Sequence, residues 1–255
     1  MKDLKAQIGA YEGVPVSGES GETEVWDRVV FPEAIRSREL DLILKVADRV
    51  KAPRVLDFGC GAGWLSRALS GRGYQSVGID VSHWLAANAA RLSSGGTPPS
   101  FLVGDCMNLP LKGMAFDLIV GIGVLHHLEP EKSLRECQRV LRPGGRLLVI
   151  EPNSLSPIAA LGRRIAPLKT RTEEEKPFHP RELKGLFLKT GWHIEEMRYL
   201  FPYSFAISRL LGLLHLGGNW IKILCPAIRG SERLLEKVVL VRQLSWCMAV
   251  VVRKA

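Results

Sequence analysis

Three glycines at alternate positions follow the apolar segment Arg54–Phe58, in a run that reads R-V-L-D-F-G-C-G-A-G. Gly59, Gly61 and Gly63 have no Cβ and adopt positive φ readily, so a ligand can lie against the backbone there. Apolar residues at helical spacing come next, which places the glycines in a strand-to-helix turn with amides at a helix start. This arrangement predicts a binding site for a nucleoside cofactor.

Two aspartates belong to the same pattern. Asp57 lies within the first strand, and Asp80 ends a second apolar strand 21 positions after Gly59. A carboxylate at the end of the second strand can accept both hydroxyl hydrogens of a ribose. The dinucleotide fingerprint has a third glycine where this chain has Trp64, so the residues favour a cofactor without a pyrophosphate. An NAD-dependent oxidoreductase is kept as the alternative.

The segment D-F-G-C-G-A-G resembles motif I of the class I S-adenosylmethionine (SAM) dependent methyltransferases, and later segments continue the resemblance. Gly104–Pro110 looks like the G-D-x-x-x-L-P segment of that family, and F-D-L-I-V-G leads to V-L-H-H-L as it does in the family. The run L-R-P-G-G-R-L-L-V-I-E-P is similar to the type 11 branch. The motifs cover about residues 50 to 155, and the resemblance implies SAM as cofactor and methyl transfer as reaction.

The resemblance also implies a role for each matching residue. Asp57 would help to hold the methionine end of SAM, Asp80 the ribose, and Asp105 the adenine amine. The amide of Cys106 would donate to a ring nitrogen of the adenine. The full set of expected cofactor-binding residues is Asp57, Gly59, Gly61, Gly63, Asp80, Val81, Asp105, Cys106 and Gly121.

The candidates for acid-base chemistry follow the fourth and fifth predicted strands. His126 and His127 come after the fourth strand and Glu151 ends the fifth, at the sheet edge where open α/β sheets bind ligands. A neutral imidazole can take a proton from a hydroxyl group near pH 7. A purely structural role stays open for His127 and for His179. No metal site is expected, because the five cysteines include no C-x-x-C pair.

The strands and helices that must position these residues are predicted to form a doubly wound α/β fold. The period of the apolar residues predicts strands over 54–58, 75–80, 101–103, 116–121, 146–150, 192–200 and 245–252, and helices over 32–50 and 181–190. The resemblance adds a Rossmann-like sheet of seven strands in the order 3-2-1-4-5-7-6, with strand seven antiparallel.

The expected organisation has three parts. Residues 1–50 form an N-terminal lid and a leading helix, with residues 1–31 irregular, and 51–151 form the SAM-binding core. Residues 152–255 complete the sheet and carry insertions near 152–180 and 201–240 that cover the acceptor. The aromatic candidates for the N-terminal lid are Tyr11, Trp26 and Phe31.

The net charge of +9 comes wholly from the last part of the chain. Residues 1–151 carry 18 basic and 18 acidic side chains, whereas 152–255 carry 17 and 8. Such an excess is typical either of solvated surface charge or of an anionic partner, and both interpretations stay open. Nucleic acid is not expected as the partner, because the chain has no zinc finger, RNA-recognition signature or interleaved basic and aromatic residues.

The apolar stretch within residues 201–240 is interrupted by Arg209, Lys222 and Arg229, so it is too short between charges to cross a bilayer. A lid with an apolar pocket is the preferred interpretation, and a segment lying in a membrane interface is the alternative. The lid and the membrane-interface interpretations are compatible if the acceptor is a lipid. We therefore expect methyl transfer to a small or lipid-like apolar acceptor.

The first residues are polar and carry no signal-peptide pattern, which favours a cytoplasmic location, with peripheral contact to an anionic inner membrane surface as an option. A noncatalytic SAM-binding module recruited to a membrane is a further alternative. The sequence does not determine the acceptor, the choice between O-, N- and C-methylation or the oligomeric state.

Overall fold

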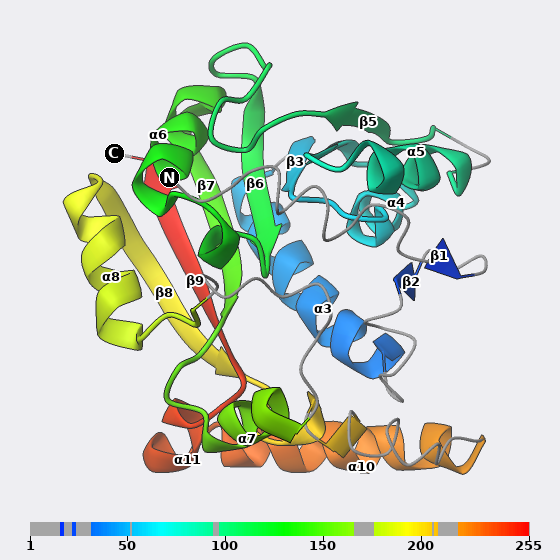
Figure 1. Cartoon of the computed structure of the whole chain (residues 1–255), viewed down its shortest axis with the longest axis vertical. Coiled ribbons are helices and arrows are strands. Elements are labelled where there is room, and N and C mark those ends of the chain that lie inside the picture. The colour runs from blue at the N-terminus through cyan, green and yellow to red at the C-terminus, as the bar shows by residue number, and fades with distance from the viewer. Residues whose placement is uncertain are drawn as a thin grey trace.

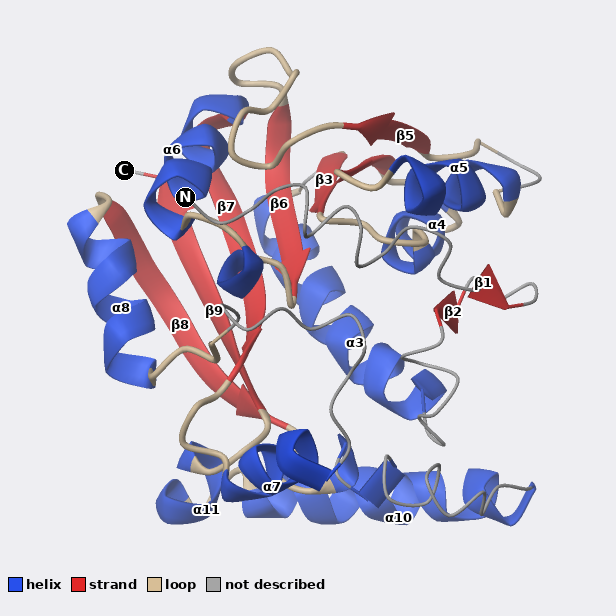
Figure 2. Ribbon diagram, viewed as in Figure 1, coloured by secondary structure: helices blue, strands red, loops and turns tan. Residues whose placement is uncertain are grey.

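The computed structural model describes residues 16–17, 22–23, 32–51, 53–93, 97–165, 176–205, 207–208 and 219–254 (Figures 1 and 2). Its strands are β1 Val16–Ser17, β2 Glu22–Thr23, β3 Arg54–Phe58, β4 Gln75–Asp80, β5 Ser100–Val103, β6 Phe116–Ile122, β7 Leu141–Pro152, β8 Trp192–Leu200 and β9 Cys247–Lys254. Its helices are α3 Pro32–Val50, α4 Trp64–Ser70, α5 His83–Arg91, the 3-10 turn η1 Leu125–His127, α6 Pro130–Val140, α7 Pro157–Ile165, α8 Pro180–Lys189, α10 Asn219–Leu235 and α11 Val239–Gln243.

Seven strands form one sheet in the order β5-β4-β3-β6-β7-β9-β8. Counted along the chain from β3, this order is 3-2-1-4-5-7-6, so the predicted topology is confirmed. Strands β3 to β7 pair in parallel, whereas β9 is antiparallel to β7 and to β8. The last residues of β3, β4, β6, β7 and β8 therefore lie at one edge of the sheet, here called the carboxyl edge, towards which β6 and β8 point in Figure 1.

The central strands are apolar on both faces because helices cover both faces. One apolar cluster joins the sheet to α6 and α8 through residues such as Leu134, Phe187 and Val250. The other joins it to α3 and α4 through residues such as Ile43 and Leu69. The result is the doubly wound arrangement that the apolar periodicity predicts.

The bounds of β3, β4, β8 and α3 are those predicted from the sequence. The prediction for the last strand was wrong by two residues, since β9 starts at Cys247. Ser245 and Trp246 are held by bonds outside the strand ladder. The Ser245 carbonyl accepts from Asn153 Nδ2 at 2.9 Å, and the Trp246 N–H donates to the Phe201 carbonyl at 3.0 Å.

The smaller differences concern element ends and the N-terminal part of the chain. Strand β5 starts at Ser100 and β6 ends at Ile122, each one residue beyond the prediction. Strand β7 starts at Leu141, before the predicted residue 146, because Leu141 pairs with Phe116 ahead of a register shift. Helix α8 covers 180–189, with the His179 side chain as its N-cap. The expectation of irregular chain over 1–31 was wrong for the short antiparallel pair of β1 and β2. The candidate lid residues Tyr11, Trp26 and Phe31 lie outside the described residues.

Helices α7, α10 and α11 lie beyond the carboxyl edge of the sheet, in the lower part of Figure 1. A buried carboxylate anchors α10 there. Glu232 accepts the N–H groups of Tyr203 at 3.2 Å and Ser204 at 2.8 Å, and it forms an ion pair with Arg38 of α3. Arg38 also pairs with Glu236. These contacts fix the end of α10 against α3, and no helix in the described part of the chain is long and apolar enough to cross a bilayer.

Candidate active site

The turn between β3 and α4 holds the three predicted glycines in left-handed conformations. Gly59, Gly61 and Gly63 have φ values of 71°, 51° and 79°. A Cβ on Gly59 would overlap the side chain of Val124, and one on Gly63 would lie 2.7 Å from the ring of Phe101. A Cβ on Gly61 would meet no atom within 4 Å. Gly59 and Gly63 are thus required by packing, whereas the space above Gly61 is open to a ligand.

Asp57 caps the helix that follows the glycine turn. Its Oδ2 accepts the Ser66 hydroxyl at 2.6 Å and the Ser66 N–H at 3.0 Å, and the residue is buried. Burial raises the pKa of Asp57 to about 7, although the two bonds from Ser66 act to lower it. Asp57 therefore has a structural role as the cap of α4, and with this pKa its carboxyl group is protonated for part of its population near neutral pH.

Asp80 ends β4 beside the same turn. Its two carboxylate oxygens accept the N–H groups of Gly61 at 2.8 Å and Ser82 at 2.9 Å. Burial raises the pKa of Asp80, while the N–H groups of Ser82, Gly61 and Val81, and the nearby His127 ring, oppose the rise. The structure thus brings together the open glycine, the predicted ribose carboxylate, Val81 and one of the candidate histidines.

Asp105 and Cys106 follow β5 at the same edge. Asp105 Oδ1 accepts the Met107 N–H at 2.7 Å, and Cys106 is buried. Gly121 lies inside β6, where a Cβ would come within 2.9 Å of Val124 Cγ1. Gly121 is therefore explained by packing against its neighbours, and it has no open space of the kind found above Gly61.

Glu151 organises the other half of the site from the end of β7. The side chain is fully buried and accepts three backbone N–H groups, from Val124 at 3.1 Å, Leu125 at 2.8 Å and His126 at 3.3 Å. Its Oε2 also lies 2.7 Å from His126 Nδ1. A carboxylate only accepts, so this contact places the proton of a neutral imidazole on Nδ1 and the lone pair on Nε2.

The other candidate histidines differ in position. The His127 ring lies 4.0 Å from the His126 ring, measured between centroids, and its Nδ1 is buried. His179 belongs to a capping box at the start of α8, in which its ring accepts from the Arg181 N–H at 3.2 Å. His126 is therefore the histidine that the structure couples to Glu151, and His179 has the structural role considered from the sequence.

One buried carboxyl group near this edge was not predicted. Glu39 of α3 is 3% exposed, and its Oε2 has no hydrogen-bond partner among the described residues. Burial raises the pKa of Glu39 to about 8, and the charge of Arg36 acts against the rise. Glu39 and Glu151 both contribute to raising the pKa of Cys247, after the larger effect of burial, which places Glu39 near the start of β9. A glutamate on a helix carries no sequence signal for such burial.

Groups of histidine, cysteine and acidic residues with the geometry of a metal site do not occur in the part of the chain that the structure describes. The arrangement is therefore a glycine turn with open space above one residue, flanked by carboxylates and by a histidine held by a buried glutamate.

Part of the chain is similar in sequence to known proteins. Residues 56–149 match the family model described as "Methyltransferase domain". A demethylmenaquinone methyltransferase from Thermus thermophilus is 38% identical over 120 residues, which are 46% of this chain and 53% of that protein. A ubiquinone biosynthesis O-methyltransferase from Rhizobium etli is 30% identical over 159 residues, 58% of this chain and 63% of that protein. The chain spans about half the length of the curated relatives it matches.

The fold also recurs among solved structures. A SAM-dependent methyltransferase from Archaeoglobus fulgidus aligns with a TM-score of 0.56 and 18% identity, covering 84% of this chain and 94% of that one. At this identity the likeness concerns the fold, which extends well beyond the matched motifs into residues 152–254.

Proposed function

Because residues 56–149 form a domain of the class I SAM-dependent methyltransferase family, we propose that this protein transfers the methyl group of SAM to a small, apolar acceptor of the quinone class. The observation that carries the proposal is the buried contact between Glu151 and His126, at the same edge as the open glycine turn. The site thus combines a place for a cofactor with a group able to remove a proton.

The residues at the glycine turn fit SAM. Gly61 has left-handed backbone and open space above it, so a ligand can approach the main chain there. Asp80 would hold the ribose hydroxyls and Asp57 the amino group of the methionine end. Asp105 would accept from the adenine amine, with the amide of Cys106 beside it. Val81 neighbours the ribose position, whereas Gly59, Gly63 and Gly121 would shape the cavity through packing.

The chain's own task is to align the acceptor and to remove its proton. Bound SAM supplies an electrophilic methyl group on a sulfonium. His126 Nε2 would take the proton of the acceptor hydroxyl, while Glu151 holds the ring through Nδ1 and stabilises the imidazolium that forms. An apolar cover over the acceptor would keep water from competing with it. His127 would support the site through its position beside Asp80.

The class of acceptor is supported by the names of the relatives. Two matched proteins of separate organisms are named for methylation in menaquinone and ubiquinone biosynthesis. Both names refer to quinones, which agrees with the small or lipid-like acceptor predicted from the apolar stretch within residues 201–240, part of which lies outside the described residues. The insertions 152–180 and 201–240 would cover such an acceptor. A cytoplasmic enzyme acting at a membrane surface would meet this substrate.

Binding of SAM is tested by calorimetry on the wild-type chain and on Asp80→Asn. We expect the variant to bind SAM about tenfold more weakly, because it loses a charged acceptor. Asp117→Asn is the matched control, since Asp117 pairs with Arg142 at the opposite edge of the sheet. Equal affinity in wild type and Asp80→Asn would remove the ribose role, and absence of SAM binding by the wild type would overturn the proposal.

Methyl transfer is tested with labelled SAM and reduced demethylated quinones. We expect His126→Gln to lower kcat at least a hundredfold with little change in SAM affinity, because general-base catalysis contributes that much. His193→Gln, an exposed histidine of β8, is the control. Binding of NADH with no SAM binding would favour the oxidoreductase alternative. SAM binding with no transfer to quinones, phenols or lipid extracts would favour the noncatalytic module.

A further inference from the structure

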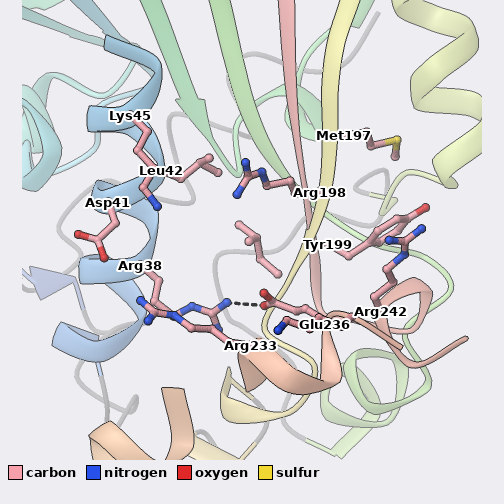
Figure 3. Close-up of a pocket in the computed structure, with 12 residues that line it drawn as sticks. Arg38, Asp41, Leu42, Lys45, Met197, Arg198, Tyr199, Arg233, Glu236 and Arg242 are labelled. Atoms are coloured by element: carbon pink, nitrogen blue, oxygen red, sulfur yellow. Dashed lines mark hydrogen bonds and ion pairs between the residues drawn. The ribbon is translucent and has the colours of Figure 1, made fainter. Parts of the chain in front are cut away.

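A cavity of about 490 Å³ lies outside the candidate active site, between α3, the end of β8 and the segment 233–244. Figure 3 shows Arg198 pointing from β8 towards Leu42 and Lys45 of α3. The residues that line this cavity are Arg38, Asp41, Leu42, Lys45, Met197, Arg198, Tyr199, Leu200, Arg233, Glu236, Lys237 and Arg242. We call it the basic pocket, because its lining has six cationic side chains and two carboxylates.

The six cations outnumber the carboxylates around them, which are Asp41 and Glu236 in the lining and Glu232 and Glu196 beside it. Arg38 pairs with Glu232 and Glu236, and Arg198 pairs with Glu196. The other four cationic side chains are exposed and have no ion-pair partner among the residues that the structure describes. These four are Lys45, Arg233, Lys237 and Arg242. Four such cations around one concave surface attract an anion. Binding of an anion to them breaks no ion pair, because they form none among the described residues.

Exposed apolar side chains alternate with these cations along the segment 233–244. Their exposed fractions are large for leucine and valine. The residues are Leu234 at 64%, Val238 at 50%, Val239 at 56%, Leu240 at 73% and Leu244 at 40%. A group of exposed apolar side chains of this size is typical of an interaction site.

The neighbouring helix α7 and the residues before it carry further exposed apolar side chains at the same end of the molecule. Asn153, just before α7, donates through Nδ2 to the carbonyls of Gln243 at 2.8 Å and Ser245 at 2.9 Å, which joins this segment to the end of α11. Leu155, Ile158 and Leu161 then follow with exposed fractions of 38%, 41% and 57%. Figure 1 shows α7, α10 and α11 gathered at one end of the molecule.

We propose that the segment 233–244, together with Leu155, Ile158 and Leu161, is a docking surface for an anionic phospholipid bilayer. The apolar side chains of α11 enter the interfacial region, and the basic pocket receives a lipid phosphate. Apolar insertion and basic attraction are each weak alone, and stable peripheral binding needs two such signals. Both signals occur here within twelve residues of chain. Charge complementarity thus favours an anionic membrane over a second copy of this chain, whose matching surface would be equally basic.

The test is sedimentation of the full chain with vesicles of phosphatidylcholine, with and without 30–40% phosphatidylglycerol (about one lipid in three). We expect binding to the anionic vesicles only, weakened by added salt. Lys237→Glu with Arg242→Glu should lower the partition coefficient about twentyfold or more. Val239→Ser with Leu240→Ser should lower it about fivefold or more, because less apolar surface enters the interface.

Matched controls carry the same changes elsewhere. Lys112→Glu with Lys184→Glu reverses two exposed cations, and Met114→Ser with Leu188→Ser removes two side chains that are 60% and 57% exposed. Neither control should change vesicle binding. Unfolding midpoints and SAM affinity of all variants should match those of the wild type, which shows that the changes act on the surface alone.

Several outcomes would overturn the proposal. One is absence of binding to anionic vesicles, and another is binding to neutral vesicles that equals binding to anionic ones. A third is a loss of vesicle binding in the control variants as large as that in the test variants. Glycerol phosphate competing at micromolar concentration would assign the pocket to a free phosphate compound instead. Loss of self-association in Val239→Ser with Leu240→Ser, without vesicle binding by the wild type, would assign the surface to a second copy. None of these results depends on methyl transfer, so the proposed function is tested separately.

Discussion

Asp57 shows how one buried carboxyl group can serve both the fold and the proposed cofactor. It caps α4 through Ser66, and burial raises its pKa from 3.8 to about 7. The folded chain therefore holds a proton that the unfolded chain has already lost above about pH 4. This group lowers stability progressively as the pH rises from about 4 to about 7, and its effect is then constant.

The same shift predicts a pH dependence of SAM binding. The ionised form of Asp57 attracts the positively charged amino group that we assign to it, so the affinity should rise about tenfold between about pH 5.5 and 7. Calorimetric titrations across this range measure the effect. Asp57→Asn should bind SAM more weakly and with a flatter pH profile. An unchanged pH profile in the variant would assign the titration to another group.

Glu39 is a second buried carboxyl group with a raised pKa, since burial raises its pKa to about 8. Above about pH 4.5 the unfolded state gains from ionising this group, so wild-type stability falls until about pH 8. Glu39→Gln removes that loss. We expect the variant to be more stable by roughly 4 kcal/mol at pH 8 and by little at pH 4.5, as measured by urea unfolding. A lower stability at pH 8 would show that the carboxyl group has a partner that glutamine cannot replace.

At the scale of elements, the turn between β3 and α4 depends on two glycines for different reasons. Gly59 faces the side chain of Val124, whereas the space above Gly61 is open. Both have left-handed backbone, which costs a residue with a Cβ about 1 kcal/mol. The turn therefore separates a position that serves packing from a position that we propose to face the cofactor.

This difference predicts that two alanine substitutions differ in whether they mainly affect stability or SAM binding. Gly59→Ala should lower the free energy of unfolding by about 3 kcal/mol, because Val124 must also move. Gly61→Ala should lower it by only about 1 kcal/mol but weaken SAM binding at least tenfold, because its methyl group fills the open space. Chemical unfolding and calorimetry on both variants compare the two effects. If the two variants bound SAM with similar affinity after correction for the fraction of folded protein, this division of roles would be contradicted.

The sequence predicted most elements because their patterns are local. Short segments rich in apolar and β-branched residues specify β3 and β4, and helical periodicity specifies α3. The start of β9 could not be predicted, since it depends on Asn153 holding Ser245 from a segment about ninety residues earlier. The early start of β7 depends likewise on pairing with Phe116. Tertiary contacts of this kind produce no local sequence pattern from which they could be predicted.

At the scale of the whole molecule, those parts of the candidate site that lie in sequence motifs could be predicted. The glycine turn, Asp80, Glu151 and His126 meet at one edge because the carboxyl ends of parallel strands must do so. The sequence did not distinguish His126 from His127, because only the folded chain places a single ring against Glu151. Burial of Glu39 and the basic pocket also depend on how α3 lies against α10, which no motif specifies.

The position of β9 between β7 and β8 has a consequence for biosynthesis. During translation, β7 emerges about a hundred residues before the strand that pairs with its free side. Until Cys247–Lys254 leaves the ribosome, the nascent sheet exposes an unpaired apolar edge, which invites pairing with other chains. Chaperones that shield such edges should therefore engage the growing polypeptide over this interval, and completion of the sheet should follow release of its last strand from the exit tunnel.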